Sequence, residues 1–417
     1  MDLFDKIHQD KGPLGKYDHF AYGYYMFPKL SGEIGPHMIF RGKEVLNWSL
    51  NNYLDLANHP EVRKADTYFA EKYGMGAPMG ARMMSGNTDL HEQLEEELSA
   101  FVNKPATMLL NYGYQGIMSV IDALTGRHDA IVYDAESHAC IIDGMRLHPG
   151  KRFVYPHNDI AGLEKQLQRA EKLTAETGGG ILVITEGVFG MSGNQGKLKE
   201  IVALKEKYTF RLLVDDAHGF GTMGATGAGT GEHQGCQSGI DLYFSTFAKS
   251  MASIGAFVSG ERAVISFLLY NTRSQIFAKS IPLPIVGGLL VRLNLLRSKP
   301  ELLTDLWTIT NSLQSGLRAK GFNIGITNSP VTPVIIPGDD THAIGMVYDL
   351  RENFGIFCSI VIYPVIPRGL IILRITPTAG HTQEDIDRTI AAFEAVQKRL
   401  NEGAYSNVDV AAIQIPA

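Results

Sequence analysis

A chain of 417 residues is too long for one compact core of ordinary size, so we expect one large domain and a smaller one. Hydrophobic residues make up 45% of the chain and charged residues 20%, which is typical of a globular enzyme and excludes a disordered or fibrous protein. A net charge of -6 and the lack of a basic stripe exclude a nucleic-acid surface.

The cysteines and the N-terminal residues indicate the cellular compartment of the protein. Cys140, Cys236 and Cys358 are widely separated and odd in number, so the sequence contains neither a disulfide framework nor zinc spacing. The first residues lack the apolar core of a signal peptide, and no apolar run reaches the length of a membrane span. We therefore expect a cytoplasmic protein without a metal site.

Residues 1–55 are predicted to form an N-terminal segment, which contains the aromatic stretch "YDHFAYGYYMFPKL". We favour an arm that packs on its own chain or on a partner subunit. The alternative is a surface that admits acyl chains or makes a peripheral membrane contact.

Residues 56–290 are predicted to form the large domain. Apolar strand-like runs alternate there with helical patterns, as in "ATMLLNYGYQGIMSVIDAL", "AIVYDAESHACIIDGMRL" and "GGILVITEGVFGMSG". This order predicts an α/β fold with a mostly parallel sheet and helices on both faces. Residues 291–417 mix shorter strands with helices and predict a smaller C-terminal α+β domain.

Polar side chains follow two of the apolar runs. Asp215 and His218 come after a predicted buried strand over 212–214, and Lys249 follows the apolar segment "LYFSTFA". Ligands bind at the carboxyl ends of strands in open α/β sheets. A lysine with few charged neighbours suits Schiff-base chemistry, and with an acid and a histidine it is suited to hold pyridoxal phosphate. Taken singly, each residue is better explained by a solvated loop or a surface helix cap.

Two glycine patterns have different interpretations. The strand–turn–helix at Gly113 and Tyr114 leaves backbone N–H groups at a helix start, where a phosphate binds well. "GFGTMG" spells the dinucleotide fingerprint, but "DDAH" separates it from its strand, so we do not expect a nicotinamide cofactor.

With these residues in place, the chain resembles the α-oxoamine synthase family of fold type I pyridoxal-phosphate enzymes over about residues 45–400. The resemblance implies the fold type I transferase fold and a homodimer in which each active site is completed by the neighbouring subunit. Seven motifs in the family's order carry it: "NNYLDLANHP", "GARMMSGNTDLHEQLE", "YDAESHACIIDG", "TEGVFGMSG", "VDDAHGFG", "TFAKS" and "LRITPTAGHT".

The resemblance also implies residue roles around the cofactor. Lys249 binds its aldehyde and later removes the Cα proton of the substrate. Asp215 pairs with the ring nitrogen, His218 with the ring hydroxyl oxygen, and His138 stacks on the ring. Without the family, His138 would be a turn histidine that caps a helix.

Further roles concern the phosphate and the substrate. The resemblance assigns the phosphate to the backbone of Gly113 and Tyr114 and the hydroxyl of Thr246. Because Ala278 replaces a common serine, Lys279 or Ser280 is expected to supply the contact from the neighbouring subunit. Asn52 and Arg374 are expected to bind the amino-acid carboxylate, since a planar guanidinium suits a bidentate contact. Without the family, Arg374 would be a strand-end arginine in an ion pair.

Two departures from the family concern the substrate. Gly190 stands where the family usually has a serine that helps to bind the substrate carboxylate, so we expect extra room beside the amino acid. Asp55 stands where glycine is usual, and the sequence alone predicts no consequence of that change.

The family reaction joins a small L-amino acid to an acyl-CoA and releases CoA and carbon dioxide, leaving an α-amino ketone. We favour serine with a long-chain acyl-CoA, the serine palmitoyltransferase reaction of sphingolipid synthesis. Cysteate, giving a sulfonolipid base, is a close alternative, and glycine or alanine with a short acyl-CoA stays open. An aminotransferase shares the fold and the lysine. A non-catalytic partner subunit is disfavoured because Lys249 is present.

Overall fold

The computed structural model describes residues 2–15, 17–363, 366 and 369–406. The chain divides into two compact units. The large unit comprises Asn51–Trp307 and Ile326–Val331, and the small unit comprises Met1–Leu50, Thr308–Gly325 and Thr332–Ala417. The domain boundaries predicted after residues 55 and 290 stay a prediction.

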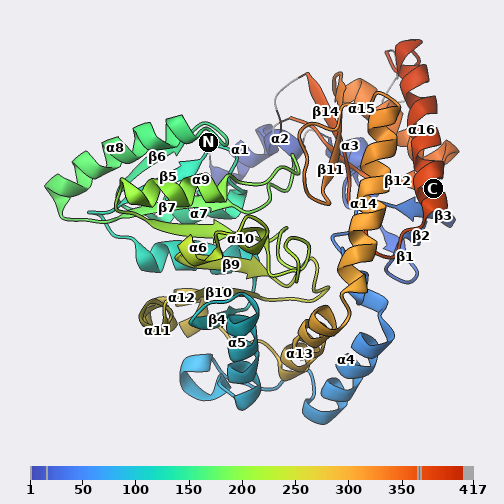
Figure 1. The fold of residues 1–417 in the computed structure, drawn as a ribbon. Coiled ribbons are helices and arrows are strands. Elements are labelled where there is room, and N and C mark those ends of the chain that lie inside the picture. The colour runs from blue at the N-terminus through green and yellow to red at the C-terminus, as the bar shows by residue number, and fades with distance from the viewer. Residues whose placement is uncertain (1, 16, 364–365, 367–368, 407–417) are drawn as a thin grey trace. The chain divides into compact units, whose positions relative to one another are not determined.

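The large unit is built on a sheet with the strand order β4-β10-β9-β8-β7-β5-β6 (Figure 1). Neighbours from β9 through β6 pair in parallel, whereas β10 pairs antiparallel with both β4 and β9. The predicted α/β fold with a mostly parallel sheet is therefore confirmed. The strands are β4 (Ala106–Leu110), β5 (Ala130–Asp134), β6 (Lys151–Tyr155), β7 (Ile181–Glu186), β8 (Arg211–Asp215), β9 (Leu242–Thr246) and β10 (Ala256–Gly260).

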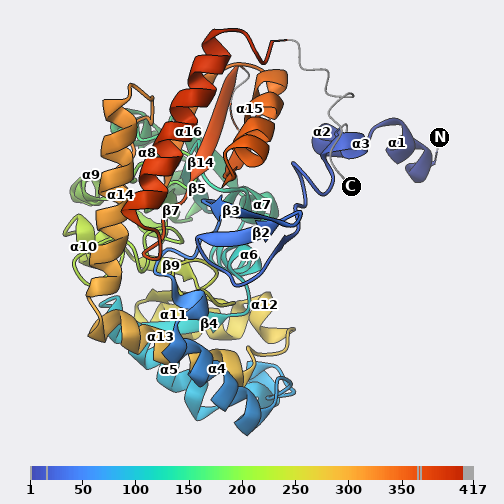
Figure 2. The ribbon, with the colours of Figure 1, turned by 90° about the vertical axis from the view of Figure 1, so that its right-hand side faces the viewer.

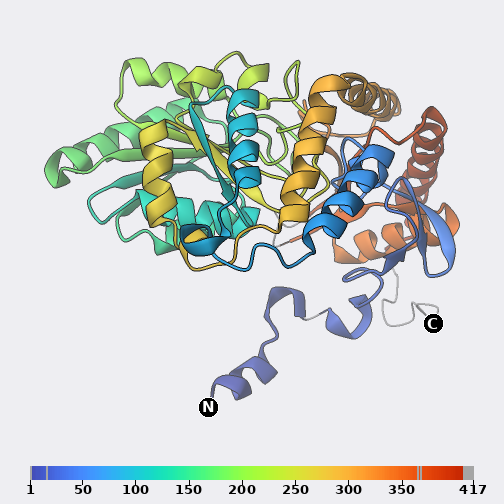
Figure 3. The ribbon, with the colours of Figure 1, turned by 90° about the horizontal axis from the view of Figure 1, so that it is seen from below.

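Helices cover both faces of this sheet, as the alternating pattern predicts. On one face, α6 (Gly113–Leu124), α7 (Ala139–Leu147) and α11 (Arg262–Asn271) share a buried apolar core with the strands. On the other face lie α8 (Ile160–Thr177) and α9 (Leu198–Ala203) (Figure 3). This placement follows from right-handed crossovers, because the chain moves across the sheet in opposite directions before and after β6.

Further elements complete the large unit. They connect the strands or pack beside β4, where α5 lies against that strand and α13 packs along α4. The elements are η1 (Leu56–Asn58), α4 (Pro60–Tyr73), η2 (Arg82–Gly86), α5 (Asp89–Phe101), η3 (Leu204–Glu206), α10 (Thr230–His233), η4 (Gln237–Gly239), α12 (Arg273–Ile276) and α13 (Leu283–Ser298).

The small unit contains two sheets, with orders β1-β2-β3-β12 and β11-β14-β13. Helices α15 and α16 lie beside β14 (Figure 2) and bury apolar side chains against it. The elements are α1 (Leu3–Gln9), α2 (Gly12–Gly15), α3 (Asp18–Ala21), β1 (Leu30–Ser31), β2 (His37–Phe40), β3 (Lys43–Asn47), β11 (Thr332–Pro337), α15 (Asp340–Asn353), β12 (Ile356–Phe357), β13 (Ser359–Val361), β14 (Leu370–Ile375) and α16 (Gln383–Asn401). Helix α14 (Glu301–Ala319) begins in the large unit and ends in the small one.

Part of the aromatic N-terminal segment packs on its own unit. Tyr24 is fully buried and donates a hydrogen bond to Glu352 at 3.0 Å. The Arg351 guanidinium lies 5.2 Å from the Tyr24 ring centroid, which is a cation–π contact. Helix α1, in contrast, has no buried residue and exposes Leu3 and Phe4. Among the described helices, none has the length and hydropathy needed to span a bilayer.

Candidate active site

Acidic side chains collect where the parallel strands of the large unit end. Asp134, Glu186 and Asp215 are the last residues of β5, β7 and β8, and all three are buried. Glu186 and Asp215 are direct partners in the register of β7 with β8. A buried carboxylate without a positive partner or a proton destabilises the fold. The carboxyl ends of these strands are therefore suited to hold a cation or a protonated group.

Lys249 supplies a positive charge to this edge. Burial is the largest influence on Glu186 and Asp215 and raises the pKa of both carboxyl groups, while the nearby Lys249 ammonium opposes that rise. The prediction that Lys249 has few charged neighbours is therefore correct along the sequence but wrong for the folded protein. The segment around it is apolar, but its acidic neighbours come from β7 and β8, which are distant in sequence.

The two consecutive aspartates after β8 have different environments. Asp216 accepts hydrogen bonds from the backbone N–H and hydroxyl of Thr230, both at 2.7 Å, and from the Tyr243 hydroxyl at 2.9 Å. Asp215 accepts one from the Ala217 N–H at 3.1 Å, and the Cys140 thiol lies 3.9 Å away. Asp216 is thus a structural anchor, and Asp215 has acceptor capacity for a bound group.

His218 is held by a residue that the sequence analysis did not assign. Its Nδ1 atom lies 2.8 Å from the hydroxyl of Tyr53, which is fully buried. A Cβ atom added at Gly190 would lie 2.5 Å from His218 Nε2. The ring therefore fills the place where we expected extra room beside the amino acid, and a substrate contact of Gly190 stays a prediction.

Gly190→Ala is expected to weaken binding of pyridoxal phosphate about tenfold, because the added methyl group displaces the His218 ring from the Tyr53 hydroxyl. Titration of the purified protein with the cofactor, followed by absorbance, measures this. Gly126→Ala is the matched control, since an added Cβ there lies 3.6 Å from Asp129, an ordinary contact. Unchanged cofactor affinity in Gly190→Ala would contradict the arrangement.

His138 sits at the N-terminus of α7 with its backbone fixed. Its N–H donates to Glu186 Oε1 at 2.6 Å, and its Nδ1 accepts from the Cys140 N–H at 3.3 Å and lies 2.9 Å from Cys140 Sγ. Partial desolvation and then the Lys249 charge lower the pKa of His138, which favours the neutral ring. The side chain is exposed, so one ring face can stack on a planar ligand. The sequence analysis missed Glu186 and Cys140.

The start of α6 forms a cradle with the end of β9. The N-cap residue Tyr112 makes no capping bond through its side chain, which leaves backbone N–H groups for an anion. A Cβ atom at Gly113 would lie 3.0 Å from Thr246 Oγ1, a tight contact that glycine avoids. The Thr246 hydroxyl donates to the Gly255 carbonyl at 2.9 Å and would rotate to bind a phosphate. Tyr114 Oη bonds to Asp143.

Three predicted residues have roles that the structure leaves as predictions. Ser280 is buried and its hydroxyl lies 2.8 Å from the carbonyl oxygens of Gly80 and Gly86, within its own chain. Asn52 is buried in the large unit, and Arg374 is buried on β14 of the small unit.

The residues of the large unit fit pyridoxal phosphate. The observation that carries the fit is the pair of buried carboxyl groups with raised pKa beside a lysine, together with the glycine-lined anion cradle at Gly113 and Thr246. The metal-ligand clusters that would suggest another kind of centre are absent from the described residues.

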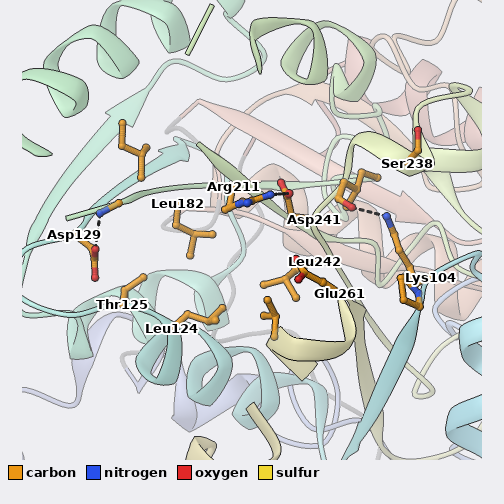
Figure 4. Close-up of a pocket in the computed structure, with 15 residues that line it drawn as sticks. Lys104, Leu124, Thr125, Asp129, Leu182, Arg211, Ser238, Asp241, Leu242 and Glu261 are labelled. Carbon is orange, nitrogen blue, oxygen red and sulfur yellow. Dashed lines mark hydrogen bonds and ion pairs between the residues drawn. The ribbon is translucent and has the colours of Figure 1, made fainter. Parts of the chain in front are cut away.

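A cavity of about 410 Å³ lies at the opposite ends of the same strands (Figure 4). Ile181, Arg211 and Leu242, the first residues of β7, β8 and β9, line it. Arg211 pairs with Asp241 at 2.8 Å across its wall, and the Lys104 ammonium donates to the Gln237 carbonyl at 2.5 Å. Because Glu186, Asp215 and Thr246 lie at the carboxyl ends of these strands, we do not place the reaction in this cavity.

Comparisons with known proteins identify the family of the chain. Residues 43–393 match the family model described as aminotransferase class I and II. The chain is 62% identical to the cysteate-C-fatty acyltransferase of Capnocytophaga ochracea, over 98% of this chain and 97% of that one. It is 37% identical to the serine palmitoyltransferase of Bacteroides ovatus, over 93% of this chain and 98% of that one.

Solved structures agree as well. The serine palmitoyltransferase of Sphingomonas wittichii superposes with a TM-score of 0.88 at 28% identity, covering 96% of this chain and all of that one. A serine palmitoyltransferase variant from S. paucimobilis, solved with a pyridoxal phosphate–myriocin adduct, has the same values.

These matches extend over nearly the whole chain and confirm both the resemblance and the cofactor. The relatives are acyltransferases that act on an amino acid and an acyl group, and the strand-edge lysine and acids of this chain suit that chemistry. The chain belongs to the aminotransferase class I and II family and, within it, to the α-oxoamine synthases, the pyridoxal-phosphate-dependent acyltransferases.

Proposed function

We propose that this enzyme condenses cysteate with a fatty acyl thioester, giving an α-amino ketone that carries a sulfonate and releasing the thiol and carbon dioxide. The supporting observation is the 62% identity over 98% of the chain with an enzyme named for cysteate and fatty acyl transfer, against 37% for a serine palmitoyltransferase. Our sequence analysis favoured serine and held cysteate as the alternative, and this identity argues for reversing the order.

The proposed chemistry divides between the cofactor and this chain. When bound, pyridoxal phosphate supplies an electron-poor ring that stabilises negative charge on the Cα atom of the amino acid. Asp215, buried at the end of β8, would hold a proton on the ring nitrogen through a charge-assisted hydrogen bond. Tyr53 would hold the His218 imidazole in place beside the ring oxygen.

Proton transfer falls to Lys249 in this proposal. Its amine would take the Cα proton and later return one, acting as a general base and then a general acid. The neighbouring carboxyl groups of Glu186 and Asp215 have pKa values raised by burial, and the nearby Lys249 charge opposes that rise. Asn52 and Arg374 would bind the amino-acid carboxylate, and Gly113 with Thr246 would hold the phosphate.

A substrate comparison tests the proposed function. Purified enzyme is given cysteate, serine, glycine or alanine with palmitoyl-CoA, and free CoA, carbon dioxide and product mass are measured, with acetyl-CoA as a second acyl donor. We expect kcat/KM for cysteate to exceed that for serine about 100-fold, because a site that pairs with the sulfonate leaves those groups unpaired with serine. A preference for serine would restore the serine palmitoyltransferase assignment. Amino-group transfer without CoA release would indicate an aminotransferase.

The assembly is inferred from the resemblance, and the location from the cysteines and the N-terminal residues. We propose a homodimer in which Ser280 or Lys279 of one subunit approaches the phosphate bound by the other. A cytoplasmic location and a peripheral membrane contact through the N-terminal segment also stay predictions.

A further inference from the structure

Two hydrogen bonds between Asp55 and Asn52 close the turn over residues 52–55. The Asp55 N–H donates to the Asn52 carbonyl oxygen at 2.9 Å, and the Asp55 carboxylate accepts from Asn52 Nδ2 at 2.9 Å. Asp55 has φ 53° and ψ 32°, a left-handed conformation that glycine adopts without strain. The chain keeps a side chain at a position where the backbone favours none, and that side chain contacts Asn52.

The oxygen and the nitrogen of the Asn52 side-chain amide each make a hydrogen bond. Its Oδ1 accepts from the Ala57 N–H at 3.2 Å, and its Nδ2 donates one hydrogen to Asp55. A flipped amide would place a donor against the Ala57 N–H and an acceptor against the carboxylate, so the orientation is fixed. The Nδ2 atom carries a second hydrogen, and the orientation determines where it points.

The same turn carries the residue that holds His218. Tyr53 is the residue after Asn52, and its hydroxyl lies 2.8 Å from His218 Nδ1. Closing the turn at Asp55 therefore holds the backbone from which both the Asn52 and the Tyr53 side chains extend.

We propose that Asp55 is a positioning residue for the substrate. Its carboxylate orients the Asn52 amide so that one N–H meets the carboxylate of the incoming amino acid, and it keeps Tyr53 in register with His218. This inference rests on the proposed role of Asn52 in substrate binding, and it adds a residue whose side chain acts only through its neighbours.

Two substitutions test the role. Asp55→Gly suits the left-handed backbone and removes the acceptor, whereas Asp55→Asn tolerates that backbone and keeps a carbonyl oxygen in its place. We expect Asp55→Gly to raise the KM for the amino acid about tenfold with kcat changed less than about twofold and no loss in melting temperature. Asp55→Asn should recover most of the KM.

Asn103→Gly is the control for relief of backbone strain, since Asn103 also has a left-handed backbone, with φ 51°, and lies in the loop after α5. It should keep the wild-type KM. Binding of the amino acid to the cofactor-loaded protein, followed by absorbance without any acyl donor, is a second readout.

The outcome is separable from the proposed function. The variants are measured with whichever amino acid the wild-type enzyme uses, so a failure of cysteate rejects the substrate and leaves this test intact. Wild-type KM and amino-acid affinity in Asp55→Gly would overturn the positioning role. Equal impairment of Asp55→Asn and Asp55→Gly would overturn it too.

Discussion

Lys249→Ala is expected to lower turnover by at least about 10³-fold while the protein stays folded, because the substitution removes the amine that we propose as the general base and as the group that binds the cofactor aldehyde. The wild-type protein should bind the cofactor covalently at this residue. Borohydride reduction followed by peptide mass spectrometry detects that bond, and CoA release measures turnover.

The control separates this lysine from the loss of any surface charge. Lys172 on α8 is exposed, and Lys172→Ala should retain wild-type turnover and the reduced cofactor adduct at Lys249. A Lys249→Ala protein with substantial turnover, or an adduct found at another lysine, would contradict the assignment of the active site.

Asp215→Asn should lower kcat about 10³-fold with little loss of stability. An amide cannot keep the ring nitrogen protonated by charge, so the ring would lose its capacity to stabilise the Cα charge. The folded protein loses little, because burial already raises the pKa of Asp215 and a neutral amide avoids the cost of a buried charge. Steady-state CoA release and thermal melting measure the two effects.

Asp216→Asn is the matched comparison and should behave in the opposite way. Its carboxylate accepts three hydrogen bonds from Thr230 and Tyr243, and an amide turns one acceptor into a donor facing a donor. We expect a loss of about 2 kcal/mol in the free energy of unfolding with the cofactor absorbance kept. If Asp215→Asn were the less stable protein and Asp216→Asn the inactive one, the two assignments would be exchanged.

Local sequence patterns were sufficient for the framework of the site. Period and turn chemistry predicted the alternating strands and helices. They placed Asp215 directly after a strand over 212–214, and in the structure it is the last residue of β8. The cofactor and the family followed from motif order, because seven short strings in sequence are far more specific than any one of them.

Contacts between distant residues were beyond that reasoning. Tyr53 and His218 are 165 residues apart, and nothing in either motif names the other as a partner. Glu186 ends a strand as Asp215 does, so the same strand-end signal could have found it. The insertion of β10 between β4 and β9 also depends on long-range pairing. The same reason explains why the expectation of extra room at Gly190 was not met. The His218 ring that fills this space comes from another segment of the chain.

Two kinds of backbone carry the residues of this enzyme. Asp215, Glu186 and Thr246 are the last residues of strands, whereas Asn52, Asp55 and Gly190 lie outside the helices and strands. Single substitutions can change such segments while the residues at the strand ends keep their positions. Relatives that share this fold can thereby come to use a different amino acid as substrate, while the residues at the strand ends stay the same.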